Sequence, residues 1–196
     1  MPLGYSRVMQ PAMIPQSFLE ERRRLGLDKL DEVWEGVLHL VPCPTAPHQL
    51  AEDRLREALK RIARRQRLEV LGGLGLYDPA VPGHDSYRVP DVVVVARANM
   101  SMRGIEGVAH LAIEIISPND ESRKKLPFYA RVGVREVWLL DPLKKTIEVF
   151  TGMAPVAPVE GRITAPSLGL VLHIEGSTLH IQDGADMYEV DIRDTL

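Results

Sequence analysis

Hydrophobic residues follow two patterns along this chain, helical spacing and short unbroken runs, and together they predict a mixed α/β fold. From His48 to about Gln66 the apolar residues recur every three or four positions, which is the spacing of an amphipathic helix. Two segments, 87–96 (YRVPDVVVVA) and 109–116 (AHLAIEII), are apolar without alternation, which is typical of strands buried on both faces. We therefore expect a mixed sheet flanked by helices.

A strand–helix–strand unit is predicted within residues 109–140. The first strand is followed by a segment that Asn119 or Asp120 could cap as a helix and that Gly133 would end. A second apolar strand follows at 136–140 (EVWLL). Such a crossover makes its two strands parallel and neighbouring or nearly so.

The remaining segments predict shorter elements. They are a charged helix at 20–25 closed by Gly26, a turn into a strand at 31–41, a strand bent by Gly72-Gly73 within 68–77, a hairpin partner at 146–151, and a small meander from Gly169 onward. We expect a single domain, 1–196, in which 18–150 form the core and 151–196 a β-rich extension.

Composition fits an ordinary globular protein. The chain has 196 residues, of which 45% are hydrophobic and 26% charged, and a chain of this size buries about 70% of its extended surface. Cys43 is the only cysteine, which excludes an intramolecular disulfide and a thiolate metal site. The longest apolar runs are far shorter than a membrane span, and residues 1–17 lack the apolar core of a signal peptide. A cytoplasmic location is therefore expected.

Charge is distributed unevenly although the net charge is only −3. Between Arg54 and Arg67, within the predicted long helix, seven basic residues stand against one acidic residue, Glu57. This basic stripe is either a solvated helix face or a surface that faces phosphates, and charge alone does not decide between the two.

Two carboxylates stand in the apolar strand segments. Asp91 follows Pro90 where one run begins, and Glu114 lies inside the other. Carboxylates in such positions are usually paired or metal-bound, and two of them converging would suit Mg²⁺. Lys124 and Lys125 follow shortly after, and a lysine beside such a pair can support the attack of water on a phosphate. The alternative is a buried ion pair of Glu114 with a basic residue and no metal.

The assembled pattern resembles the PD-(D/E)xK nuclease superfamily and, more specifically, the Uma-type family of putative restriction endonucleases. Pro90-Asp91, a strand glutamate and a downstream lysine carry the first resemblance. The second covers roughly residues 20–150 and rests on five segments: DEVWEGVL (31–38), PHQ (47–49), YRVPDVVVV (87–95), AHLAIEIISPN (109–119) and ESRKKLPFYARVGVREVWLLD (121–141). It implies a restriction-endonuclease-like core.

The resemblance also implies roles for individual residues. Asp91 and Glu114 would be metal ligands, together with the backbone carbonyl of Ile115. The superfamily lysine is expected two residues after the glutamate, but that position is Ile116. In the Uma-type pattern the lysine lies four residues before a tyrosine, and Tyr129 therefore selects Lys125 over Lys124.

Three further positions match the family with less definite roles. Glu32 matches an N-terminal acidic position, where it could hold a second metal, orient Lys125 or be a surface acid. His48 matches a histidine before the first long helix, and it could be a ligand, touch phosphate or cap that helix. Glu121 stands where the family commonly has aspartate.

The resulting expectation is a Mg²⁺-dependent DNA endonuclease, with Mn²⁺ as a substitute metal, in which Asp91, Glu114, Lys125 and Glu32 form the catalytic set. Cleavage of both strands of a duplex needs two active sites, so a homodimer is expected. Two alternatives remain open. One is a non-catalytic module that binds nucleic acid or protein, and the other is a hydrolase of another substrate built on His48 and Glu52.

Overall fold

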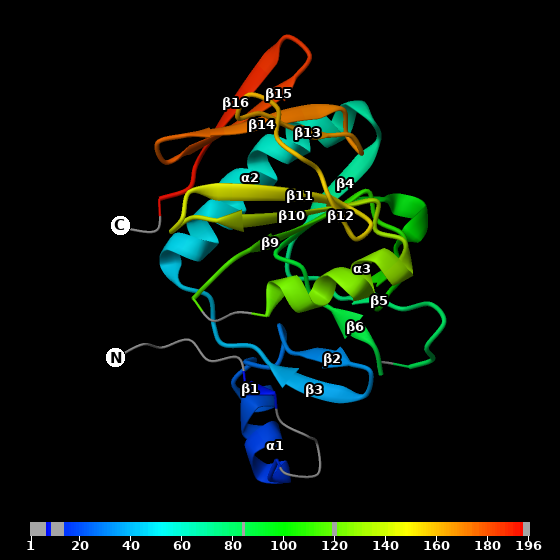
Figure 1. The fold of residues 1–196 in the computed structure, drawn as a ribbon. Coiled ribbons are helices and arrows are strands. Elements are labelled where there is room, and N and C mark those ends of the chain that lie inside the picture. The colour runs from blue at the N-terminus through cyan, green and yellow to red at the C-terminus, as the bar shows by residue number, and fades with distance from the viewer. Residues whose placement is uncertain (1–6, 9–13, 84, 119–120, 194–196) are drawn as a thin grey trace.

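The structure is a computed structural model that describes residues 7–8, 14–83, 85–118 and 121–193, and its fold is a mixture of helices and mixed sheets (Figure 1). The helices are α1 (Gln16–Arg24), α2 (Ala46–Arg65) and α3 (Leu126–Val132), with 3₁₀ turns η2 (Arg97–Asn99) and η3 (Ser122–Lys125). The fold class predicted from the sequence is confirmed.

The central sheet has the strand order β12-β11-β10-β9-β7-β4. Its members are β4 (Leu68–Leu71), β7 (Val92–Ala96), β9 (Leu111–Ile115), β10 (Glu136–Asp141), β11 (Thr146–Thr151) and β12 (Ala154–Pro155). Strands β9 and β10 are parallel neighbours, as the predicted crossover requires, and β10 and β11 form an antiparallel hairpin. Strand β7 runs antiparallel to β9 on the other side.

Two smaller sheets lie at either end of the molecule in Figure 1. The N-terminal sheet has the order β1-β3-β2-β6-β5-β8, and the C-terminal sheet is β13-β14-β15-β16. The first comprises β1 (Arg7–Val8), β2 (Glu32–Trp34), β3 (Val37–Leu40), β5 (Leu76–Tyr77), β6 (Tyr87–Arg88) and β8 (Ile105–Glu106). The second comprises β13 (Ile163–Ala165), β14 (Leu170–Glu175), β15 (Thr178–Asp183) and β16 (Asp186–Asp191).

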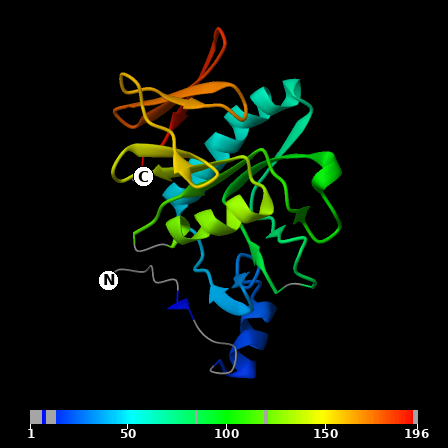
Figure 2. The same ribbon diagram turned by 45° about the vertical axis from the view of Figure 1, so that its right-hand side comes forward.

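The long helix α2 begins where its sequence provides a cap. The Thr45 hydroxyl accepts a hydrogen bond from the His48 backbone N–H at 3.4 Å, and Pro47 lies in the first turn, where no N–H is needed. The apolar face of α2 buries Leu55, Leu59 and Ile62 completely, in one core with the central and C-terminal sheets. Helix α3 packs in a second hydrophobic core, on the other side of the central sheet (Figure 2).

Three predicted strands differ from the observed ones. The segment 87–96 is two strands in different sheets, because Pro90 has no N–H to continue a ladder. The segment 68–77 likewise divides into β4 and β5 at the glycine pair. The segment 31–41 is a hairpin, because Glu35 and Gly36, with φ of 48° and 83°, form a tight turn between β2 and β3.

The predicted helix after β9 is shorter than expected. Asn119 and Asp120, its predicted caps, lie outside the described residues. The chain forms the turn η3 first, and Pro127 then stands in the first turn of α3, where a proline is tolerated. Gly133 ends α3 at φ 89°, as predicted. Among the described residues, none of the helices is long and apolar enough to cross a membrane.

Candidate active site

A cavity of about 1180 Å³ lies where β2, β3, the start of α2 and the ends of β7 and β9 meet. The antiparallel register pairs Val92 of β7 with Ile113 of β9, so Asp91 and Glu114 come to the same end of these two strands. Both carboxylates line the cavity, together with Glu32, His48 and Lys125. The residues that the sequence assigned to catalysis therefore come from four separate segments and share one cavity.

Glu114 is held by two hydrogen-bond donors from the segment that follows β9, one on η3 and one on α3. Its side chain is 3% exposed, Lys125 Nζ donates to Oε2 at 3.0 Å, and the Tyr129 hydroxyl donates to Oε1. Lys125 and Tyr129 lie four residues apart across η3 and α3, so one short element supplies both donors. The spacing that selected Lys125 in the sequence thus corresponds to a shared contact with Glu114.

Lys125 also contacts Glu32, whose carboxylate is almost fully buried. The Lys125 Nζ–Glu32 Oε1 distance is 2.8 Å. Glu32 is fixed by the backbone N–H of Val89 at 2.8 Å and by the indole N–H of Trp34 at 2.7 Å. Lys125 therefore bridges two buried carboxylates. By contrast, the Lys124 side chain is 69% exposed and pairs with Glu121 at 2.5 Å.

The titration of these groups reflects their burial. Burial raises the pKa of Glu114 to about 8, and the charge of Lys125 opposes that rise while Asp91 and Glu32 add to it. Burial alone would lower the pKa of Lys125, but the adjacent Glu114 and Glu32 outweigh it and raise this pKa. The ammonium thus stays protonated, and Glu114 holds a proton more readily than an exposed glutamate.

Asp91 joins the strand ends to helix α2. Its Oδ2 accepts a hydrogen bond from the Ile115 backbone N–H at 2.6 Å, and its Oδ1 lies 3.1 Å from His48 Nε2. His48, Glu52 and Asp91 each offer a ligand atom within 4.8 Å of the others. Sequence reasoning offered His48 as a ligand, a phosphate contact or a helix cap of the nuclease, but it placed Glu52 only in an alternative hydrolase and connected neither residue to Asp91. Their spacing of four on one helix was the available signal.

The charges in this group are interdependent. Burial, then the charge of Asp91, raises the pKa of Glu52, and Arg56 and His48 only partly oppose this. Burial alone would lower the pKa of His48, but its hydrogen bond to Asp91 and the charges of Asp91, Glu52 and Glu114 together leave this pKa raised. A cation bound between such carboxylates would lower their pKa values, because its positive charge offsets their mutual repulsion.

The donor set fits a divalent cation that prefers oxygen. Asp91, Glu114 and Glu52 present carboxylates to one cavity, and burial first, with the charge of Asp91 adding to it, raises the pKa values of Glu52 and Glu114. Carboxylate and carbonyl oxygens of this kind suit both Mg²⁺ and Mn²⁺. The ion pair of Glu114 with Lys125, which was the alternative to a metal, is present as well.

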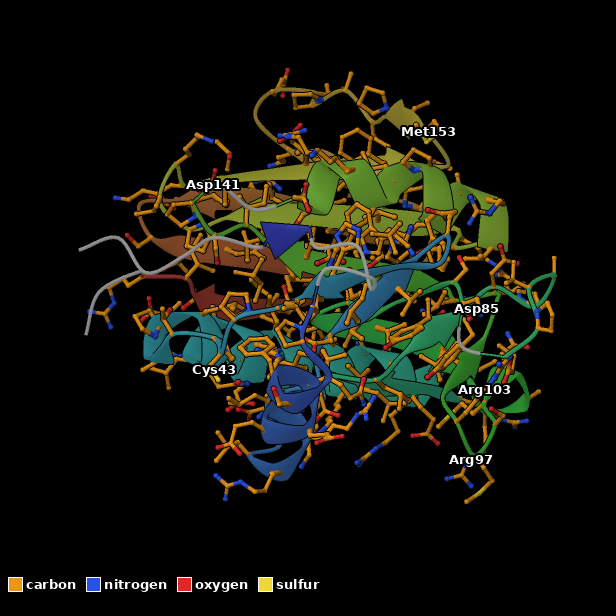
Figure 3. All side chains as sticks on the ribbon, turned by 90° about the horizontal axis from the view of Figure 1, so that it is seen from below. Cys43, Asp85, Arg97, Arg103, Asp141 and Met153 are labelled. Carbon is orange, nitrogen blue, oxygen red and sulfur yellow. The ribbon has the colours of Figure 1, made fainter. Side chains whose placement is uncertain are left out.

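The remaining sequence candidates also line the cavity. Ile115 contributes its N–H to Asp91, and the ligand role of its carbonyl stays a prediction. The carboxylate of Glu121 lies 3.4 Å from His39 Nδ1. Cys43 is free and exposed on the cavity wall, and Figure 3 shows it on the opposite side of the molecule from Arg97 and Arg103.

The basic stripe of α2 is largely matched by acidic residues. Arg61 pairs with Glu57 on the same helix at 2.7 Å. Arg54 reaches Asp191 of β16 at 3.3 Å, and Arg65 pairs with Asp186 at 2.7 Å and with Asp183. Two of the seven basic residues, Arg54 and Arg65, therefore join α2 to the C-terminal sheet, which favours the structural interpretation for this part of the stripe.

Comparisons with known proteins agree with this fold. A family model named Uma2 and described as "Putative restriction endonuclease" matches residues 21–174. The crystal structure of a putative nuclease belonging to DUF820 from Anabaena variabilis ATCC 29413 is similar, with a TM-score of 0.58 and 20% sequence identity over 71% of this chain and 83% of that one. At this identity the likeness concerns the fold alone. No curated protein matches the chain.

Proposed function

Because the chain belongs to the Uma2 family of putative restriction endonucleases, as its motifs predicted, we propose that it is a metal-dependent nuclease that hydrolyses phosphodiester bonds in DNA. The observation that carries this proposal is the grouping of Asp91, Glu114 and Lys125 in one cavity, with Lys125 held by a second buried carboxylate, Glu32. A purely structural ion pair needs one carboxylate for one lysine, whereas this cavity holds more acids than bases.

The cation that we propose is Mg²⁺, with Mn²⁺ as a substitute, held by Asp91, Glu114 and the carbonyl of Ile115. When bound, it supplies Lewis acidity that polarises a phosphate and offsets its developing negative charge. The side chains of the protein position the groups that would hold this cation. Asp91 is oriented by the Ile115 N–H and by His48, and Glu114 is oriented by Tyr129.

Lys125 has two tasks in this proposal. Its ammonium is aimed into the cavity by Glu32 and Glu114, so it can orient a water molecule and stabilise negative charge on a phosphate oxygen. Glu32 acts through Lys125, because its second oxygen is already committed to Trp34. His48, with its raised pKa, is placed to donate a proton near Asp91 or to contact the phosphate.

A second candidate function is a binding module that keeps the nuclease fold without cleavage. The observation that favours it is the pairing of the α2 arginines with acidic residues, which leaves less basic surface to hold DNA strongly.

We propose that the nuclease is a homodimer, since two active sites are needed to cleave both strands of a duplex. The mass of the protein in solution tests that point.

Nicking of a supercoiled plasmid in Mg²⁺ or Mn²⁺ tests the proposal. The parent chain should nick DNA only with the divalent cation, and Asp91→Ala should abolish nicking. Lys125→Ala should do the same, whereas Lys124→Ala, its exposed neighbour, should remain active. An inactive parent chain that still binds DNA would favour the binding module, and nicking that survives Asp91→Ala would refute the assigned site.

A further inference from the structure

The outer face of the C-terminal sheet carries a second group of potential metal ligands. Along β14, Leu170 and Leu172 point into the core, so the alternating residues His173 and Glu175 point outward. On β15, His180 lies directly opposite His173 in the antiparallel register. Three side chains that bind transition metals therefore project from the same face of one hairpin.

Their geometry brings the donor atoms together. The imidazole rings of His173 and His180 stack with centroids 4.5 Å apart and an interplanar angle of 8°. One ligand atom from each of His173, Glu175 and His180 lies within 4.8 Å of the other two. The Nδ1 atom of His173 is buried and has no hydrogen-bond partner among the described residues, so a buried acceptor or donor is left unsatisfied there.

We propose that His173, Glu175 and His180 form a binding site for a divalent transition-metal cation of the zinc class. Two imidazoles and one carboxylate are the ligand set of zinc sites that leave a fourth position open. Zinc bonds of about 2.0–2.2 Å place neighbouring ligand atoms roughly 3.3–3.6 Å apart, so the three donors need to close by at most about 1.5 Å. Side-chain rotation on a surface allows that closure.

The backbone beneath the site is suited to hold this arrangement. The hairpin closes through a tight turn at Gly176 and Ser177, with φ of 61° at Gly176, and its ladder pairs every residue from Val171 to Glu175. Glu189 on β16 lies opposite His180, with its carboxylate 3.7 Å from His180 Nδ1. A carboxylate that accepts the second ring N–H of a ligating histidine is a common support of such sites, and Glu189 would have to move closer to His180 to act in this way. A bound ion would fasten β14 to β15.

This site is separate from the nuclease cavity in both place and chemistry. The C-terminal sheet lies at the opposite end of the molecule from β2 and β3, with α2 and the central sheet between them (Figure 1). Carboxylate oxygens select Mg²⁺ in the cavity, whereas paired imidazoles select zinc-like ions and bind Mg²⁺ poorly. The inference does not depend on the proposed nuclease activity.

Calorimetric titration of the full-length, metal-free chain with ZnCl₂ tests the inference. The titration is done in an Asp91→Asn, His48→Ala background and with excess Mg²⁺, so that the cavity loses its imidazole and one carboxylate and keeps only oxygen ligands for Mg²⁺. One zinc ion should bind per chain. His173→Ala and His180→Ala should each weaken this binding by more than about tenfold, since losing even a ligand's supporting partner costs that much. The matched control, His110→Ala, removes a half-buried histidine elsewhere and should leave binding unchanged.

Thermal unfolding with and without ZnCl₂ provides a second readout that does not depend on the histidine variants folding. Zinc should raise the melting temperature of the background chain, and Glu175→Gln, an exposed and nearly isosteric change, should remove most of that rise. The inference is overturned if the background chain binds no zinc under these conditions, or if the three ligand variants bind it as tightly as the His110→Ala control.

Discussion

Replacing Lys125 with methionine removes its charge but keeps much of the length of its side chain. In the parent chain Nζ lies 2.8 Å from Glu32 Oε1 and 3.0 Å from Glu114 Oε2, and these two glutamate side chains are 2% and 3% exposed. The substitution leaves both carboxylates buried without their cation. The matched change, Lys124→Met, affects a lysine whose side chain is 69% exposed.

The size of the effect follows from these contacts. At an effective dielectric constant of about 20, the contact with Glu32 near 3 Å contributes about 5–6 kcal/mol of Coulomb energy before desolvation is subtracted. The contact with Glu114 contributes less at neutral pH, because a pKa raised to about 8 leaves that carboxyl only partly charged. Breaking a buried ion pair from one side typically costs about 3–5 kcal/mol. We therefore expect Lys125→Met to lower the free energy of unfolding by about 3–5 kcal/mol at neutral pH. Lys124→Met should change it by less than about 0.5 kcal/mol.

The difference between parent and variant should depend on pH. Because the pKa of Glu114 is raised to about 8 in the folded chain, this group destabilises the fold progressively as pH rises from its unfolded pKa to about 8. Without Lys125 that pKa rises further, so the decline continues above pH 8 in the variant. The stability gap should therefore widen between pH 7 and pH 9, by up to about 1.4 kcal/mol per unit.

Urea unfolding followed by tryptophan fluorescence, at pH 7 and pH 9, measures these differences for the parent chain and both variants. The reasoning is refuted if Lys125→Met loses less than about 1 kcal/mol, well below the expected cost of a broken buried pair. It is also refuted if the gap between parent and variant narrows as pH rises.

Three further changes test neighbouring contacts. A Cβ at Gly72 would lie 2.7 Å from the backbone oxygen of Asp91. Gly72→Ala should therefore lower the free energy of unfolding in urea by about 1–3 kcal/mol and slow plasmid nicking, and an unchanged free energy of unfolding would contradict this close approach. Tyr129→Phe removes the hydroxyl donor to Glu114 and should cost about 1–3 kcal/mol by the same measurement, whereas no loss would mean the bond is not formed. Arg65→Ala breaks exposed ion pairs with the C-terminal sheet and should lower the melting temperature slightly, with the difference vanishing in high salt; a salt-independent loss would show another cause.

Much of the fold could be predicted because its strongest patterns are local. The apolar runs around Asp91 and Glu114 and the helical spacing of 48–66 correspond to β7, β9 and α2. The crossover rule then gave the parallel pairing of β9 with β10. The break between β6 and β7 at Pro90 was not predicted, because the division of one apolar run between two sheets depends on tertiary packing that no local pattern records.

The candidate site was predictable to the extent that it breaks the apolar pattern. Acids inside apolar strands identified Asp91 and Glu114, and the spacing to Tyr129 distinguished Lys125 from Lys124. The link from Glu52 to Asp91 was missed because it joins residues on two elements whose contact is set by the core. The pairing of Arg65 with Asp186 was missed for the same reason, since more than one hundred residues separate them. The catalytic roles themselves stay predictions.

The central claim is that Asp91 and Glu114 hold one catalytic cation, and anomalous diffraction from crystals soaked in Mn²⁺ tests it most directly. The account predicts a Mn²⁺ peak within about 2.0–2.6 Å of an oxygen of each carboxylate and of the Ile115 carbonyl. Such a peak requires Glu114 to release at least one of its contacts with Lys125 and Tyr129. A peak that is coordinated only by His48, Glu52 and Asp91, or no peak in the cavity, would contradict the account.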